Sequence, residues 1–349
     1  MILPHNDSTL ILLMALCLLC WGSWASLFKS AKKYRFELFY FDFGFGLAIA
    51  ALICALTFGS LGYDGLPFTG DLMYARKQEW LYGFLAAVIF NLGNMLTLAS
   101  VSVAGMAVAF PLSFGAAMIV GGWMSYMSHP GTSAMVMLAG TVFMLLSVIL
   151  NSSAYSQLRI LQHETVARAG KAKSTRRPSS IKGIALALVG GCLMGVFAPL
   201  LRRAQDADDG VGPYSMLFIF SGAVVVSTFV FNLFFMNLPV EGDPLEIVEY
   251  FNSSLWNHVR GFAAGAIWGI GALASFVAAT PKGTIHPSIP LGPILSQSAP
   301  LLAALWGVLI WKEFKGGDMR VKVLAAFMLV LFASGVVAFS CAPLFSNQP

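Results

Sequence analysis

Apolar residues fill long uninterrupted runs along this chain, and polar residues are confined to short segments between the runs. Each run holds roughly 20 residues, enough for a helix to cross a hydrocarbon core about 30 Å thick. The pattern predicts an all-α integral membrane protein with ten transmembrane helices. The ten predicted spans are Leu10 to Phe28, Phe36 to Gly59, Trp80 to Val101, Val103 to Met127, Ser133 to Ser153, Ile181 to Leu201, Pro213 to Asn237, Val259 to Ala279, Ile285 to Trp311 and Val321 to Cys341.

The longest hydrophilic stretch, 155–180, divides these spans into two sets of five. We therefore expect a first five-helix repeat at 1–154, a disordered basic linker at 155–180 and a second repeat at 181–349. Because five is odd, two halves with the same internal plan enter the membrane in opposite orientations. Gly83 and Phe84 of the third span align with Gly261 and Phe262 of the eighth. The third and fourth spans nearly touch, which predicts a tight turn within 100–105.

Composition and charge support a membrane location. Hydrophobic residues make up 58% of the chain and charged residues 11%, against about 25% charged in soluble domains. The net charge of +5 does not indicate nucleic-acid binding, because the 21 Lys and Arg lie in short segments between apolar runs. Most of them fall on the odd-numbered connections, so we expect those connections, including the 155–180 loop, in the cytoplasm. Both termini are then expected on the outer side of the cell membrane.

Prolines mark two possible helix interruptions at matching places in the halves. Pro111 lies in the fourth span and Pro290 in the ninth. Interrupted helices at corresponding positions often line a transporter's central site. A packing kink is the alternative.

Acidic residues begin the second span only. Glu37 is expected near the cytoplasmic interface, while Asp42 lies deeper in the run. An intramembrane carboxylate is a candidate proton-coupling group. The alternatives are an ion pair of Glu37 with Arg35 or Lys33, and a structural salt bridge for Asp42.

Amide and aromatic side chains in the spans are candidate ligands for a polar or planar solute. The amides can equally join helices, and Trp24 can lie at the membrane interface. The candidate substrate-binding residues are Trp21, Trp24, Tyr40, Asn91, Asn94, Trp268 and Gln297.

Enzyme signatures such as His-Glu-x-x-His or Gly-x-Ser-x-Gly do not occur. The five histidines are scattered among termini and connections, so we expect no metal site, and no cofactor is indicated. The sequence favours a transporter over an enzyme and sets no number of subunits.

Trp21-Gly-Ser-Trp24 in the first span and Trp311-Lys-Glu-Phe314 after the ninth resemble the drug/metabolite transporter superfamily. Further segments look like its ureide permease branch, near the glucose/ribose and rhamnose porters. They are Arg35 to Tyr40 with Asp42, Asn91 to Asn94, and Ala109 to Pro111.

The resemblance implies proton-driven uptake of a small polar solute by alternating access. The solute class expected is a ureide, nucleobase or nucleoside. Sugar uptake of the glucose, ribose or rhamnose type, and export of drugs or metabolites, are the alternatives. The expected partners are the solute, H⁺ and the lipid bilayer.

Overall fold

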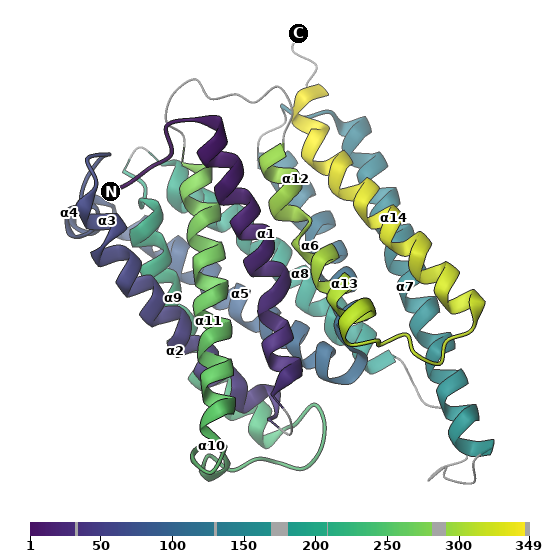
Figure 1. Cartoon of the computed structure of the whole chain (residues 1–349). Helices are drawn as coiled ribbons and strands as arrows, with labels where there is room; N and C mark the ends of the chain where they lie inside the picture. The colour runs from purple at the N-terminus through teal and green to yellow at the C-terminus, as the bar shows by residue number, and fades with distance from the viewer. Residues whose placement is uncertain (32–33, 129–130, 169–180, 208, 281–290, 346–349) are drawn as a thin grey trace. The chain divides into compact units, whose positions relative to one another are not determined.

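The chain folds into helices joined by short connections (Figure 1). The computed structural model describes residues 1–31, 34–128, 131–168, 181–207, 209–280 and 291–345. Within these residues, nine helices are long and apolar enough to cross a bilayer. They are α1 (Asp7–Ser30), α2 (Phe36–Leu56, continued by α3, Phe58–Leu61), α5 (Lys77–Ala104), α6 (Met106–Ser128), α7 (Ala134–Arg168), α8 (Ile181–Asp206), α9 (Pro213–Asn237), α11 (Leu255–Ala279) and α14 (Met319–Cys341).

The ninth predicted span is the one without a long helix. Its beginning, with Pro290, lies outside the described residues. The rest forms α12 (Leu291–Gln297), α13 (Ala299–Leu305) and a π-helical turn (Trp306–Ile310), with Ile294–Ile310 as a shorter apolar helical stretch. Nine spans therefore stand in the described residues, and the tenth stays a prediction. The remaining short elements are α4 (Phe68–Tyr74), α10 (Val248–Phe251) and a 3-10 turn (Ala342–Phe345).

Helix α7 corrects the expected disorder after residue 154. It continues to Arg168, so residues 155–168 are helical. Tyr155 and Leu158 are buried on this extension, and their packing accounts for a helix that outlasts the apolar run. Residues 169–180 lie outside the described residues.

The predicted tight turn between the third and fourth spans is confirmed at Gly105. This residue has φ +90°, a left-handed conformation that glycine adopts without strain. Helix α6 begins at the next residue, and the carboxylate of Glu313 accepts from its first two N–H groups. Helix α6 also runs unbroken through Pro111, so the interruption expected there is absent. Pro111 is the sixth residue of α6, so the helix accommodates it with the loss of one backbone hydrogen bond, the one to the carbonyl of Ala107.

The chain forms two compact units. The first unit holds 1–95 and 196–299, and the second holds 96–195 and 300–349. Each unit thus combines chain from both sides of 169–180, and α5 and α8 each contribute to both units.

In the first unit, α2 and α11 pack backbone against backbone. A Cβ at Gly46 would overlap the carbonyl oxygen of Phe262, and a Cβ at Gly265 would overlap that of Phe43. Small residues allow this approach, which is a common way for helices to associate in lipid. The close packing brings the N-terminal turns of the two helices together.

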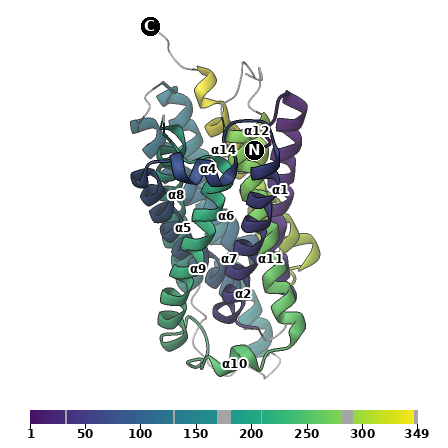
Figure 2. The ribbon, with the colours of Figure 1, turned by 90° about the vertical axis from the view of Figure 1, so that its left-hand side faces the viewer.

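Two short helices cover opposite ends of the first unit. Figure 2 shows α4 at its upper end and α10 at its lower end. On α4, Phe68 packs edge-on against Phe218 of α9, with ring centroids 5.3 Å apart. On α10, Tyr250 packs edge-on against Phe41 of α2 at 5.6 Å. Each short helix thus lies near the N-terminal turns of one spanning helix.

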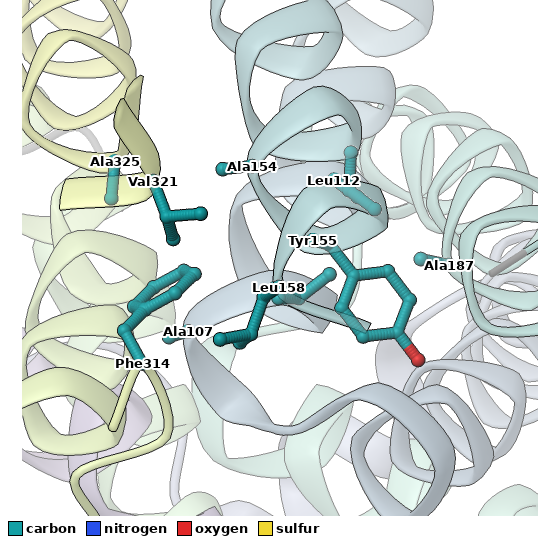
Figure 3. Packing of buried hydrophobic residues seen from close by; sticks show 10 residues of the cluster. Ala107, Leu112, Ala154, Tyr155, Leu158, Ala187, Phe314, Val321 and Ala325 are labelled. Atoms are coloured by element: carbon teal, nitrogen blue, oxygen red, sulfur yellow. The ribbon is translucent and has the colours of Figure 1, made fainter. Parts of the chain in front are cut away.

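The second unit has its own apolar core, shown in Figure 3. Leu112 of α6 and Tyr155 and Leu158 of α7 lie in this core with Val321 and Ala325 of α14. Phe314, in the connection between the π-helical turn and α14, also belongs to this core. Helices α7 and α14 lie side by side (Figure 1).

Candidate functional site

A carboxylate, a histidine and two phenols meet in the first unit. Asp42 lies in the second turn of α2 and is 5% exposed. Its Oδ2 accepts a hydrogen bond from the Tyr34 hydroxyl at 2.6 Å, and its Oδ1 accepts from the Tyr250 hydroxyl at 2.7 Å. Nδ1 of His258 lies 3.0 Å from Oδ2 and 3.1 Å from Oδ1. We call these four residues the Asp42 cluster.

Three separate segments of the chain build the Asp42 cluster around α2. Tyr34 immediately precedes α2, Tyr250 lies on α10, and His258 lies in the first turn of α11. Gly261, one turn further along α11, faces Asp42, and a Cβ there would come 2.5 Å from the Asp42 Cβ. The missing side chain therefore lets α11 approach the carboxylate.

Protonation states in the cluster follow from its donors and acceptors. An ionised carboxylate only accepts, so Nδ1 of His258 carries the hydrogen that faces Asp42. Burial, followed by the hydrogen bond to Asp42, raises the pKa of Tyr34 above its usual range, and the same causes raise the pKa of Tyr250. Both phenols therefore remain neutral donors at physiological pH.

Glu37, the second acid of this span, is already paired. Arg35 donates to both of its carboxylate oxygens, from Nη2 at 2.6 Å and from Nε at 3.3 Å. Glu37 is fully buried, while Arg35 also donates to the carbonyl of Asp243. These contacts match the ion pair that the sequence offered as the alternative to proton coupling.

Tyr40 and Asn94 form a buried polar pair between α2 and α5. Nδ2 of Asn94 donates to the Tyr40 hydroxyl at 2.9 Å. Tyr40 is fully buried and Asn94 is 2% exposed. Tyr40 and Asp42 are two positions apart on α2, so their side chains point in different directions. The pair is thus distinct from the Asp42 cluster.

Asn91 joins helices instead. Its Nδ2 donates to the hydroxyls of Ser227 and Thr228 and to the carbonyl of Val224, all on α9. These three hydrogen bonds from one amide hold α5 against α9. Asn91 and Asn94 therefore share a helix face but bind different neighbours.

The aromatic candidates form a connected group in the first unit. Trp21 and Trp268 are stacked, with ring centroids 5.7 Å apart, and Nε1 of Trp21 donates to the carbonyl of Trp268. Phe220 of α9 stacks against Trp268 at 5.7 Å. Trp24 is buried against Phe43 at 5.0 Å, so it packs in the interior of the unit.

Three predicted site residues remain: Gln297, Pro111 and Pro290. Gln297 ends α12, which packs beside α1, and it is half-buried. Pro111 belongs to the second unit and Pro290 lies outside the described residues. Among the described residues, no group of three or more His, Cys, Asp or Glu side chains is arranged to hold a metal ion.

Sequence reasoning identified Asp42 but missed its three partners. His258 was grouped with histidines scattered among connections, although it lies just inside a spanning helix. The signal available was its position at the start of an apolar run, the one histidine so placed in the spans that the structure describes. Tyr34 and Tyr250 carried no comparable signal.

Comparison with known proteins places the chain in a family. The ureide permease family model matches residues 161–342. Ureide permease 2 of Arabidopsis thaliana is 21% identical over 396 residues, covering 96% of this chain and 97% of the relative. Ureide permease 1 of the same plant is 23% identical over 376 residues, covering 93% and 94%.

A solved crystal structure of a protein matches the fold over nearly the whole chain. The TM-score is 0.53 at 15% identity, with 95% of this chain and 98% of that chain covered. At this identity the match concerns the fold alone. The family match over more than half of the sequence goes further: the chain belongs to the ureide permease family, and it is a multi-pass membrane transporter, not an enzyme.

Proposed function

We propose that this chain imports a ureide by proton symport with alternating access. The observation that carries the proposal is the Tyr40–Asn94 pair buried in a membrane-spanning unit. A carboxamide presents an acceptor oxygen and donor hydrogens side by side. A ureido group presents the complementary set of C=O and N–H groups, so Asn94 suits it as a partner.

The stacked indoles of Trp21 and Trp268 support the same class of solute. Trp21 is half-buried and lies on α1, at the edge of the aromatic group. A flat heterocyclic ureide can stack on such a ring. We propose Trp21, Trp24, Tyr40, Asn94, Trp268 and Gln297 as substrate-binding residues. Asn91, also a candidate from the sequence, instead holds α5 against α9.

Proton coupling is proposed for Asp42. Intramembrane carboxylates are costly and mark ion and proton pathways by default. Asp42 lies within a span, among groups able to exchange protons. Glu37 is the weaker candidate because Arg35 neutralises it.

We also propose ten spans in two inverted repeats, with the termini outside a cell membrane and the 155–180 segment in the cytoplasm. The short helices α4 and α10, at opposite ends of the first unit, support this arrangement. Helix α4 precedes α5 and covers α9, while α10 precedes α11 and covers α2. An inverted repeat would relate these two arrangements to one another.

Uptake into proteoliposomes tests the proposed function. Labelled allantoin, uracil and glucose serve as ureide, nucleobase and sugar probes, each with and without an inward proton gradient. We expect the proton gradient to drive accumulation of labelled allantoin, and excess unlabelled allantoin to inhibit it. Accumulation of glucose instead would identify a sugar porter, and uptake without gradient dependence would remove the symport. Outward transport driven by the gradient would identify an exporter.

A further inference from the structure

We propose that His258 is the residue that takes up and releases the coupled proton, with Asp42 balancing the charge that results. This inference rests on the symport proposed above and names its proton-binding group. Asp42 and His258 are in contact at 3.0 Å, on α2 and α11 respectively. Both belong to the first unit.

The hydrogen bonds of Asp42 favour His258 as the proton acceptor. Tyr34, Tyr250 and His258 already direct three donors at the two carboxylate oxygens. Because a carboxylate offers about four lone-pair sites, these three donors already occupy most of the hydrogen-bonding capacity of Asp42. On His258, by contrast, Nε2 has no hydrogen-bond partner among the residues the structure describes, and its lone pair is available when Nδ1 carries the hydrogen.

Exposure points to the same residue. The His258 side chain is 23% exposed, and that of Asp42 is 7% exposed. A proton can therefore reach the imidazole without crossing the carboxylate. When it binds Nε2, the ring becomes an imidazolium whose charge is paired with the Asp42 carboxylate, and release of the proton restores the neutral ring.

The other charged side chains on the neighbouring elements form no ion pair with His258 in the part of the chain that the structure describes. Arg35 pairs with Glu37, and Arg260 of α11 contacts Oδ1 of Asn257. Lys29 lies in the last turn of α1, and α9 has no Asp, Glu, Lys, Arg or His. The acids on and before α10, namely Glu241, Asp243, Glu246 and Glu249, are exposed. Asp42 is the carboxylate that contacts the ring.

Tyr250 connects the proton site to the segment that covers it. Its hydroxyl reaches Asp42 from α10, and its ring lies edge-on to His258 with centroids 4.7 Å apart. Movement of α10 would thus remove a donor from Asp42 and uncover the imidazole together. Tyr250 thus takes part both in proton exchange at His258 and in the opening of this end of the unit.

The first test measures proton and allantoin fluxes together, with a pH dye inside proteoliposomes. We expect His258→Gln to exchange allantoin across the membrane without a gradient, but neither to accumulate it nor to carry protons with it. His163→Gln, on α7 in the second unit, is the matched control and should keep both fluxes. Tyr250→Phe should retain coupling and sustain uptake to higher pH, because the carboxylate with one donor fewer holds the imidazolium more strongly. Coupled fluxes at the wild-type level in His258→Gln would overturn the inference.

A second test does not depend on any solute. A double-mutant cycle of His258→Gln and Asp42→Asn is followed by thermal unfolding in detergent. The pairing energy should be larger at about pH 5.5 than at about pH 8, because only the imidazolium attracts the carboxylate fully. Equal coupling at both pH values would overturn the inference. If wild-type protein moves no ureide, the proposed function fails, and this cycle still decides whether the pair binds a proton.

Discussion

The carboxylate of Glu313 accepts a hydrogen bond from the backbone N–H of Met106 at 2.9 Å and a second from Ala107 at 2.7 Å. A side chain more than 200 residues away in sequence thereby caps α6. Charged acceptors at a helix N-terminus satisfy unpaired N–H groups and complement the helix dipole.

We expect Glu313→Ala to lower the stability of the protein by about 1 to 2 kcal/mol, because two capping bonds are lost. Glu313→Gln keeps one acceptor oxygen and should fall between wild type and alanine. Thermal unfolding in detergent measures the order. Equal melting temperatures for wild type and Glu313→Ala would show that this cap contributes nothing.

Glycine substitutions test the contact between α2 and α11. Gly265→Ala should be destabilising by about 1 to 3 kcal/mol or more, because its Cβ would overlap the carbonyl oxygen of Phe43. Gly222→Ala, on α9, is the control, since a Cβ there meets nothing within 4 Å. Yield and melting temperature of the purified variants measure the difference. Similar behaviour of the two variants would contradict the close packing of the helices.

The two asparagines of α5 should respond differently to substitution. Asn91→Ala should mainly lower the melting temperature, because it leaves the hydroxyls of Ser227 and Thr228 without their shared donor. Asn94→Ala should raise the KM for allantoin with a smaller loss of stability. Uptake kinetics and thermal unfolding of both variants separate the effects. An unchanged KM in Asn94→Ala would remove that residue from the binding site.

Asp71 gives a pH dependence of stability outside the spans. Burial raises its pKa, against the opposing hydrogen bonds from Ser215 and the Gly212 N–H. The folded state therefore binds the proton more tightly than the unfolded chain. The resulting stabilisation is full below the unfolded pKa of about 3.8 and is lost as pH rises through the folded value.

Asp71→Asn should abolish this pH-dependent part of the stability, because an amide does not titrate between about pH 4 and about pH 7. Its oxygen can still accept from the Gly212 N–H. Melting temperatures measured from about pH 4 to about pH 7 should vary less in the variant than in wild type. Asp7→Asn, at an exposed carboxylate, is the control. Identical pH profiles for wild type and Asp71→Asn would refute the assignment.

The apolar runs contained enough information to locate nine spanning helices, because insertion into lipid depends on local composition. They underestimated the length of α7. The part of this helix beyond the apolar run is polar on the outside and is stabilised by the burial of Tyr155 and Leu158. They also predicted a break at Pro111 that is absent, because α6 accommodates the loss of one backbone hydrogen bond there. Local pattern thus gives the elements, while packing decides their ends.

The candidate site was harder to predict because its contacts are long-range. Asp42 was noticeable because a carboxylate inside an apolar run is rare. Its partner His258 is 216 residues later, and no spacing rule connects them. Asn91 and Asn94 looked equivalent at three residues apart, and only the identity of the neighbouring helix distinguishes them.

The same separation has a consequence for biosynthesis. At about 5 to 20 residues per second, the ribosome makes His258 roughly 10 to 40 s after Asp42, because the two are separated by 216 positions. During that interval α2 is in the bilayer while α10 and α11 do not yet exist. Tyr34 is then the one cluster partner already synthesised, and exposure of the carboxylate to lipid costs about 2.5 to 3.5 kcal/mol, which contact with a chaperone, the translocon or water would reduce. The nascent permease is therefore most vulnerable to quality control before its eighth long helix is translated.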